Sequence, residues 1–384
     1  MNPMMSPLVA INAHLLSGDA SYRSAGISTY IARLLEHLSD AAPSLRYEVF
    51  MGDTDATLLS GGRLAVRRSR WSTSRPLRRV AWEQTILPNL LRRSGAALLH
   101  APAFVAPVRR VCPYVLTVHD LSFVHHPEFF RAANRLYLKT LTGLSGRRAT
   151  AVITISDATA RDVHRLLGVP SKSIFTVYPG VSPDFYPRPD RDVARFRREM
   201  NLPERFVLYL GTLEPRKNLV RLVRAFAQLD RDDVHLVLAG AKGWSYEDIL
   251  AEIEHLALGD RVHIPGYVSS ESLPFWYNAA SVFAYPSIHE GFGIPVLEAL
   301  ACGVPTLTST STSLPEAGGD ATVQVLPFDD EAIATGLDRL LTDEGLRETL
   351  RAEGLDHARH FSWARMAEET TEVYRWALAQ NTLA

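Results

Sequence analysis

Short apolar runs alternate with helix-length amphipathic segments along most of this chain. In the first half, helical periodicity over residues 27–38 and 134–144 falls between runs that predict buried strands. Because strands and helices alternate in this way, the pattern predicts a parallel sheet with crossover helices. The strands expected in this half are residues 8–15, 47–51, 97–100, 114–118, 151–155 and 174–178.

The second half repeats this rhythm and predicts a second sheet of the same kind. Between the halves, four prolines fall in residues 179–189, as is typical of a linker. We therefore expect one domain over residues 1–180 and a second that begins at residue 181. The strands expected in the second half are residues 206–210, 235–239, 262–264, 282–285 and 306–308.

Length and composition agree with two domains of an ordinary globular protein. At 384 residues, the chain is long enough for each domain to bury a core. Only Cys112 and Cys302 are present, so no disulfide framework is expected. The protein is therefore expected in the reducing cytoplasm. No cation precedes Arg23, so the first apolar run predicts a strand rather than a signal peptide. No apolar run reaches about 18 residues, so no membrane-spanning helix is expected.

The most informative motif, His-Glu-Gly-Phe-Gly-Ile-Pro-Val-Leu-Glu at residues 289–298, places two carboxylates on either side of a glycine-rich turn. Pro295 suits the start of a helix, so Glu290 is expected in the preceding loop and Glu298 on the first helical turn. The glycines let a ligand approach the backbone, and the positive end of the helix attracts a diphosphate. One carboxylate can then face a sugar and the other a ribose, although turns of this kind also precede helices in many unrelated α/β proteins.

A second motif, Gly-Thr-Leu-Glu-Pro-Arg-Lys-Asn at residues 211–218, follows the strand expected at 206–210. Arg216 and Lys217 thus lie at the carboxyl end of a parallel strand, where open α/β sheets bind ligands. Two cations there can hold a diphosphate leaving group. An isolated Arg-Lys pair is more often only solvated, but the glutamate motif favours the binding interpretation.

With these two motifs, the chain resembles a retaining glycosyltransferase of family four. Within that family, it resembles the bacterial mannosyltransferases of cell-surface polysaccharide synthesis. The resemblance implies an α/β fold of GT-B architecture, in which two Rossmann-like domains face each other across a cleft. It implies an acceptor-binding domain over 1–180, a nucleotide-sugar-binding domain over 181–362, and a last helix, 363–384, that crosses back to the first domain. Further segments that carry it are residues 117–120 (Thr-Val-His-Asp), 264–268, 299–305, 314–316 (Leu-Pro-Glu) and 361–363.

The resemblance also implies roles for individual residues. Glu298 binds the ribose, Glu290 lies near the hydroxyls of the transferred sugar, and His119 contacts the donor, although its position alone is typical of a core residue. The first loop lacks one of the family's two glycines, so only Gly26 is carried over there. The expected catalytic residues are His119, Arg216, Lys217 and Glu290. The expected nucleotide-sugar-binding residues are Gly26, Gly211, Arg216, Lys217, Gly266, Tyr267, Glu290, Gly291, Phe292, Gly293, Ile294, Pro295, Leu297 and Glu298. Structural or solvent-facing positions are expected for three other histidines, His125, His126 and His289.

No residue stands out as a covalent nucleophile, so the resemblance implies a front-face substitution that retains the anomeric configuration. It would move a hexose of mannose or glucose type from GDP-mannose or a UDP-hexose to a glycan or polyprenyl-linked acceptor. No cofactor and no metal are expected, since the Asp-x-Asp triplets at 190–192 and 230–232 are interpreted as solvated turns. The alternatives are a hydrolase, phosphorylase or nucleotide-sugar epimerase on the same frame, or a non-catalytic carbohydrate-binding protein.

Charge is divided unevenly between the halves. Residues 1–180 hold 22 Lys and Arg against 11 Asp and Glu, whereas residues 181–384 hold 19 against 31. Arginines interleaved with apolar residues between 63 and 93 can lie on an anionic membrane surface, such as the inner face of the cell membrane, or form an ordinary solvated region. Nucleic acid is not expected, because no recognition motif accompanies the charge. These arginines are Arg63, Arg67, Arg68, Arg70, Arg75, Arg78, Arg79, Arg92 and Arg93, and the apolar residues are Trp71, Trp82, Ile86, Leu87, Leu90 and Leu91.

Overall fold

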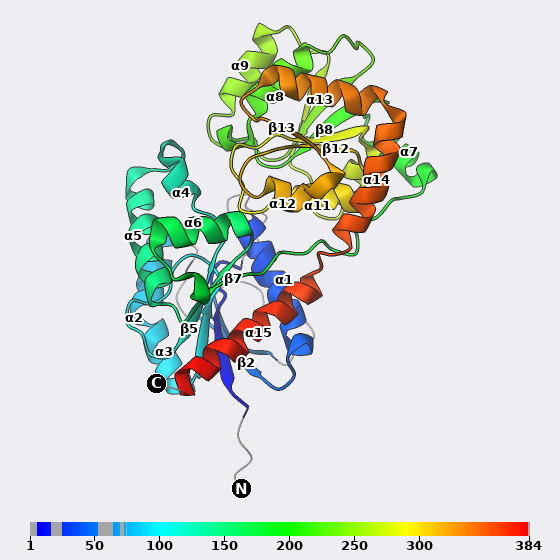
Figure 1. Ribbon diagram of the computed structural model, residues 1–384. Helices are drawn as coiled ribbons and strands as arrows, with labels where there is room; N and C mark the ends of the chain where they lie inside the picture. The colour runs from blue at the N-terminus through cyan, green and yellow to red at the C-terminus, as the bar shows by residue number, and fades with distance from the viewer. Residues whose placement is uncertain (1–5, 17–24, 53–63, 70–72, 74, 383–384) are drawn as a thin grey trace. The chain divides into compact units, whose positions relative to one another are not determined.

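The computed structural model describes residues 6–16, 25–52, 64–69, 73 and 75–382. The chain divides into two compact units (Figure 1). The first unit joins residues 1–180 with residues 363–384, and the second comprises residues 181–362. These bounds coincide with those expected from the linker and the last helix. Among the described residues, no helix combines the length and apolar character needed to cross a membrane.

The first unit is built on a parallel sheet. Its described strands are β1 (Leu8–Asn12), β2 (Arg46–Met51), β3 (Leu64–Arg68), β4 (Leu98–Ala101), β5 (Tyr114–Val118), β6 (Ala151–Thr154) and β7 (Ile174–Thr176). Their order is β3-β2-β1-β4-β5-β6-β7, and every neighbouring pair is parallel. The strand order reverses between β1 and β4, and doubly wound sheets bind ligands at the carboxyl ends of such a pair.

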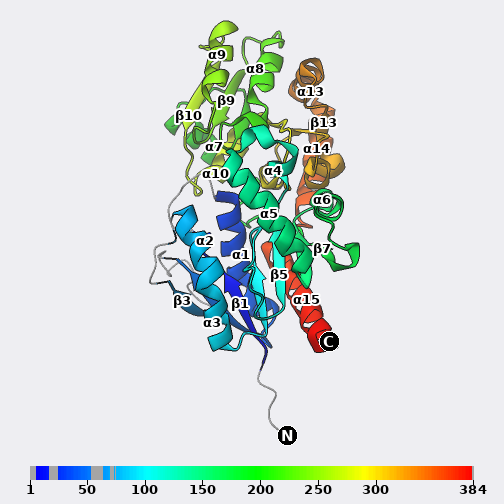
Figure 2. The same ribbon diagram turned by 90° about the vertical axis from the view of Figure 1, so that its left-hand side faces the viewer.

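Helices cover both faces of this sheet, which is why its inner strands are buried almost throughout. In Figure 1, α1 and α15 lie side by side on one face, and Figure 2 looks onto the face that α2, α3 and α5 cover. On the latter face, Leu99, Leu116 and Val152 of the strands pack in one core with Trp82 and Leu91. The described helices of this unit are α1 (Ala25–Ala41), α2 (Pro76–Thr85), α3 (Leu87–Ser94), α4 (Ser122–His125), η2 (Pro127–Phe129), α5 (Ala132–Arg148), α6 (Asp157–Leu167), η3 (Ser171–Ser173) and α15 (Trp363–Thr382).

The last helix, α15, belongs to the first unit although it comes from the far end of the chain. It contacts α1, β4, β5 and β6. The Tyr374 hydroxyl lies 2.6 Å from Nδ1 of His100 on β4, and the rings of Trp376 and Phe175 meet edge to face at 5.0 Å. Helix α15 therefore supplies part of the buried core of the first unit.

The second unit repeats the same plan. Its described strands are β8 (Phe206–Leu210), β9 (His235–Ala239), β10 (Val262–Gly266), β11 (Val282–Tyr285), β12 (Thr306–Ser309) and β13 (Val323–Val325). They are parallel in the order β10-β9-β8-β11-β12-β13, so the order reverses between β8 and β11. The described helices are α7 (Asp190–Glu199), η4 (Pro215–Lys217), α8 (Leu219–Ala227), α9 (Glu247–His255), α10 (Leu273–Ala279), α11 (Ile294–Ala301), α12 (Leu314–Gly318), η5 (Gly319–Ala321), α13 (Asp330–Thr342) and α14 (Glu344–Ala358).

Three elements differ from the sequence-based expectations. Strand β3 runs through a segment that was interpreted only as basic surface, and as an edge strand it tolerates Arg67 and Arg68. Strand β13 was not expected. The triplet Asp190-Arg191-Asp192 is not a turn between elements but the first turn of α7, where carboxylates suit the positive end of the helix. The other triplet, 230–232, lies in the connection after α8, where Arg231 pairs with Asp338 at 2.8 Å.

Candidate functional site

The two motifs of the second unit meet where its strand order reverses. The short helix η4 follows β8, and the loop that holds Glu290 follows β11. The backbone N–H of Ile288 donates to the carbonyl of Arg216 at 2.9 Å, and the Asn218 side chain donates to the carbonyl of Pro286 at 3.0 Å. Asn218 adopts a left-handed φ of 64°, which Asn tolerates better than most residues. These bonds hold the loops after β8 and β11 against each other.

A compact ionic cluster lies at this junction. The Lys217 ammonium donates to Oε1 of Glu290 and to the Tyr285 hydroxyl, both at 2.6 Å. Arg216 donates to Oε2 of Glu290 at 3.0 Å and to the carbonyl of His289 at 3.2 Å, and it also pairs with Glu214. Both oxygens of Glu290 are therefore held by cations. The sequence predicts Arg216, Lys217 and Glu290 at one site, and the structure brings them together.

Burial makes the charges of this cluster depend on one another. Lys217 is 6% exposed and Glu290 8% exposed. Burial alone would raise the pKa of Glu290, but Lys217 and Arg216 outweigh it and lower this pKa to about 2. Burial lowers the pKa of Lys217, and the charge of Arg216 adds to that effect, whereas Glu290 opposes it. Glu290 is therefore an ionised carboxylate at neutral pH.

The cluster is more nearly neutral than the sequence motif predicts. Two cations, Arg216 and Lys217, face two carboxylates, Glu290 and Glu214. Glu214 and Tyr285 were not predicted as site residues, although Glu214 lies within the motif at 211–218 and Tyr285 shortly precedes the motif at 289–298. An ammonium has three donors, and two of those on Lys217 are used within the protein. The third has no hydrogen-bond partner among the described residues.

Hydroxyl groups after β12 clamp the loop of Glu290. The backbone N–H of Glu290 donates to Oγ1 of Thr312 at 3.1 Å, and the Ser313 hydroxyl lies 2.9 Å from the carbonyl of Glu290 and 3.0 Å from that of Phe292. Gly293 follows with φ 113°, and a Cβ there would lie 2.7 Å from the Leu314 side chain. Thr312 and Ser313 were not among the predicted site residues, although they belong to a run of alternating Ser and Thr at 308–313.

Glu298 lies farther along α11 than expected. It is the fifth residue of that helix, so it begins the second turn rather than standing on the first. Its Oε2 accepts the Tyr277 hydroxyl at 2.7 Å. Burial raises the pKa of Glu298 to about 7, even though the Tyr277 hydrogen bond lowers it. Tyr277 of α10 is a further residue of this region that sequence reasoning did not identify.

The other expected donor residues of the second unit lie around the same edge. Gly211 follows β8, Gly266 ends β10 with φ 86°, and the Tyr267 side chain is 60% exposed. In contrast, the side chain of Leu297 is fully buried in the core, so it cannot contact a ligand directly. Phe292 is also buried and packs on Phe361 with ring centroids 5.7 Å apart, which leaves its backbone as the part that can bind.

Two expected site residues belong to the first unit. His119 follows β5 and is buried, with Nε2 2.8 Å from the carbonyl of Pro102 and its ring edge to face with Tyr30 at 4.9 Å. Burial lowers the pKa of His119, so the ring is neutral at physiological pH. These contacts are those of a packed histidine, the interpretation that its position alone favoured. Gly26 lies in the first turn of α1, and a Cβ there would meet open space.

The histidines expected to be structural have partners. His125 lies 2.6 Å from Asp162, and His126 lies 3.2 Å from Glu128. His289 is buried, and its carbonyl accepts the Arg216 guanidinium. No group of three or more metal-ligating side chains occurs within the described part of the chain.

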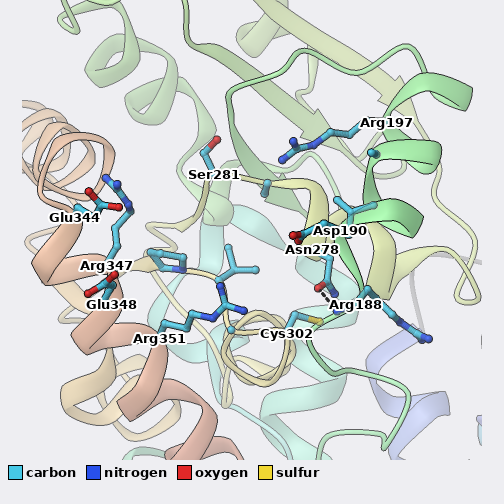
Figure 3. A pocket seen from close by; sticks show the side chains of 16 residues that line it. Arg188, Asp190, Arg197, Asn278, Ser281, Cys302, Glu344, Arg347, Glu348 and Arg351 are labelled. Atoms are coloured by element: carbon cyan, nitrogen blue, oxygen red, sulfur yellow. Dashed lines mark hydrogen bonds between the residues drawn. The ribbon is translucent and has the colours of Figure 1, made fainter.

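A cavity of about 550 Å³ lies at the opposite edge of the second sheet. Ser281 and Pro305, which line it, precede β11 and β12, so it opens at the amino ends of these strands. Figure 3 shows Arg197 reaching toward it from α7 and Arg347 beside Glu344 on α14. None of the expected site residues lines this cavity, and its mixed charges favour no class of ligand. Its volume therefore does not locate the candidate site.

Comparisons with known proteins identify the family. Residues 24–185 match the model of Glycosyltransferase Family 4, and residues 190–357 match that of Glycosyl transferases group 1. The O-antigen chain mannosyltransferase B of Escherichia coli is 34% identical over 302 residues, which are 78% of this chain and 77% of that protein. The chain belongs to glycosyltransferase family 4. It is thus an enzyme that transfers a sugar from a nucleotide-sugar donor, as the sequence predicts.

Solved structures agree on the fold of this glycosyltransferase. The sucrose-phosphate synthase of Thermosynechococcus elongatus matches with a TM-score of 0.75 and 22% identity, covering 97% of this chain and all of that one. HepE of Anabaena, solved in complex with UDP, matches with a TM-score of 0.75 and 19% identity, covering 96% and 99%. The predicted GT-B fold class with its two parallel-sheet α/β domains is therefore confirmed.

Proposed function

We propose that this glycosyltransferase moves a mannosyl residue from GDP-mannose to a glycan or polyprenyl-linked acceptor, with retention of configuration and without a metal. The observation that carries the proposal is the buried cluster of Lys217, Arg216 and Glu290 at the carboxyl ends of β8 and β11. The likeness to a mannosyltransferase of O-antigen chains supports the choice of sugar and acceptor class.

In this proposal, the leaving diphosphate binds beside Lys217 and Arg216, and these two cations take the role that a metal ion has in other transferases. The third N–H of Lys217 donates to a phosphate oxygen, and the amides at the start of α11 add their partial positive charge. Charge on the diphosphate grows as the glycosidic bond breaks, so donors fixed in advance stabilise the transition state more than the ground state.

Glu290 is poorly suited to attack the anomeric carbon. Each of its oxygens is held by a cation, and its pKa near 2 makes it a weak base and a weak nucleophile. These features support a front-face substitution in which the acceptor hydroxyl attacks on the side of the leaving group and passes its proton to the departing phosphate. Glu290 then keeps the two cations in place and orients the sugar hydroxyls.

A melting-shift screen with nucleoside diphosphates and their sugars tests the donor, since a ligand that binds the folded state raises the melting temperature. We expect GDP and GDP-mannose to give the largest shifts, and transfer to octyl α-D-mannopyranoside to continue in excess chelator. A larger shift with UDP sugars would replace the donor. Release of free mannose, mannose 1-phosphate or an epimer without an acceptor would replace transfer by hydrolysis, phosphorolysis or epimerisation.

The raised pKa of Glu298 predicts a pH dependence of donor binding. Below about pH 7 the carboxyl is protonated, and above it the carboxylate can accept charge-assisted hydrogen bonds from a ribose. Such bonds are worth roughly 1.5–3 kcal/mol, against about 1 kcal/mol for neutral ones. The affinity for GDP-mannose, whose diphosphate does not titrate near neutral pH, should therefore rise with pH through about 7 in wild type when measured by calorimetry, and Glu298→Gln should show a weak, flat profile. The same rise in Glu298→Gln would contradict this role, and Glu353→Gln on exposed α14 serves as the control.

Several residues of the basic segment between 63 and 93, which could bind a membrane, make contacts within the first unit instead. One of the two interpretations of the basic segment places Trp82, Leu87 and Leu91 against lipid, but all three are buried in the core of the first unit. Arg67 pairs with Glu48 of the neighbouring strand. Three of the residues named in the sequence, Arg63, Arg70 and Trp71, lie outside the described residues. The side chains of Trp82, Leu87 and Leu91 are thus not free to face lipid, and we propose only an electrostatic attraction for this segment.

We expect this attraction to act at the inner, anionic face of the cell membrane. The protein should bind vesicles that contain anionic lipid and detach as salt rises, because exposed charges are screened over about 8 Å at physiological ionic strength. Changing four exposed arginines of the first unit to Ser should weaken binding more than changing four exposed arginines of the second unit. The first set is Arg75, Arg78, Arg92 and Arg93, and the control set is Arg191, Arg195, Arg198 and Arg359. Equal binding to neutral and anionic vesicles would remove the membrane from the proposal.

A further inference from the structure

The carboxyl end of β1 carries a second buried polar cluster, in the first unit. Asn12 ends β1 and His14 follows two residues later, at the place where the strand order of this sheet reverses. This is the topological equivalent of the junction of β8 and β11, where the ionic cluster lies in the second unit. Doubly wound sheets bind their ligands at such a junction.

Contacts from α2 and from the segment after β3 complete this cluster. The Asn12 amide donates to Oε1 of Glu83 at 3.0 Å. Nδ1 of His14 lies 2.8 Å from the Thr73 hydroxyl, and the His14 ring packs on Trp82 with centroids 3.7 Å apart. Gly52, at the end of β2, allows this approach, because a Cβ there would lie 2.5 Å from the Thr73 hydroxyl oxygen.

Two atoms of the cluster are buried without a partner. Oδ1 of Asn12 and Nε2 of His14 make no hydrogen bond with any residue that the structure describes, although both residues are only 6% exposed. A buried polar atom without a partner costs free energy, and native proteins keep few of them. Two such atoms on neighbouring residues, at a ligand-binding junction, are better explained by recognition than by stability.

The chemistry of the cluster favours hydroxyl groups over an anion. Burial lowers the pKa of His14 to about 4, so the imidazole is neutral at physiological pH. Burial also raises the pKa of Glu83, which Arg79 and Asn12 oppose. An amide oxygen, a neutral ring nitrogen and a carboxyl group can each exchange hydrogen bonds with sugar hydroxyls, and none of these three groups supplies the positive charge that binds phosphate. The cluster thus differs in kind from the cationic pair Lys217 and Arg216 of the second unit.

We infer that Asn12, His14 and Glu83 bind hydroxyl groups of the acceptor glycan, with the free atoms of Asn12 and His14 as its partners. This inference rests on the proposed function for the identity of the acceptor, but not for the identity of the donor. Thr73 and Trp82 are positioning residues, since they hold the His14 ring and do not contact the sugar.

The sharpest variant pair separates recognition from structure. His14→Phe combined with Thr73→Val turns both ends of their hydrogen bond apolar and removes Nε2, while the ring on Trp82 remains. Replacing both partners by apolar groups of similar shape is nearly neutral for stability or stabilising. Thr73→Val alone is the matched control, because it keeps Nε2. Glu36→Gln, at an exposed position of α1, is the control outside the cluster.

Three readouts on the full chain give the test. The first is the melting shift with GDP, the second the hydrolysis of GDP-mannose in water, and the third the KM for octyl α-D-mannopyranoside. We expect the double variant to raise the acceptor KM about tenfold or more, which corresponds to about 1.4 kcal/mol, with its melting temperature and GDP shift kept. Glu36→Gln should stay close to wild type in all three readouts. Thr73→Val keeps Nε2 but leaves Nδ1 of His14 unpaired, so it should raise the acceptor KM less than the double variant does.

Each failure has its own signature. An unchanged acceptor KM in the double variant would overturn the inference and leave the cluster structural. If wild type neither binds nor hydrolyses GDP-mannose, the proposed donor fails, and the inference is then tested by the melting shift with methyl α-pyranosides of mannose, glucose and galactose. A shift in wild type that the double variant loses supports the inference. No shift with any of them overturns it.

Discussion

Lys217→Met should lower kcat by roughly 10²–10³, the usual loss when one preorganised donor to a developing charge is removed. Its ammonium is held by Glu290 and Tyr285 at 2.6 Å each, so it is in place before the diphosphate begins to leave. Because the leaving charge grows in the transition state, the KM for the donor should change much less than kcat. Steady-state kinetics with GDP-mannose measures both quantities.

Metal addition and a matched variant complete this experiment. Wild-type activity should survive excess chelator, and Mg²⁺ should not restore activity to Lys217→Met. Lys242→Met removes an exposed cation of the same unit and should have little effect. Loss of wild-type activity in chelator with recovery in Mn²⁺ would mean that an Asp-x-Asp triplet had been wrongly dismissed. A rise in donor KM with kcat unchanged would assign Lys217 to ground-state binding instead.

Much of the fold follows from the sequence, because parallel strands buried on both faces leave long apolar runs. Strands β5, β8, β9 and β11 lie within the predicted bounds without error. Edge strands need no such run, since one side is open to solvent, and this is why the charged β3 was missed. Strand β13 was missed because it is only three residues long and partly buried.

The candidate site was predictable where chemistry and topology coincide in the sequence. Arg216, Lys217 and Glu290 follow two adjacent parallel strands, so their meeting could be inferred from strand order. The partners that set their charge states could not, because Glu214, Thr312 and Ser313 reach the cluster through loop conformation. Leu297 is also expected to bind the nucleotide sugar, but its side chain lies in the core, so only its backbone is left for such a contact.

Glu290→Ala should cause the largest loss of stability in the second unit. Removing one partner of a buried ion pair leaves the other charge uncompensated and typically costs about 3–5 kcal/mol. For a unit of this size, each kcal/mol shifts the melting temperature by about 2–4 °C. Glu290→Gln keeps the shape, but its amide has a single acceptor oxygen, so it can accept from Lys217 or from Arg216 and turns an NH2 group toward the other cation. It should therefore lose less stability than Glu290→Ala while still lowering turnover. Calorimetry of both variants, with the melting shift by GDP, measures these effects.

The pKa of Glu290 fixes the sign of the pH dependence. Its folded value of about 2 lies below its ordinary value of 4.5, so its contribution to stability is complete above about pH 4.5 and is lost as the pH falls toward 2. Glu290→Gln should lack this part of the acid destabilisation. Because Lys217 causes most of the cost in Glu290→Ala, the double variant Glu290→Leu with Lys217→Met should recover much of the lost stability while remaining inactive. A double variant no more stable than Glu290→Ala would show that the cluster does not act as a coupled pair.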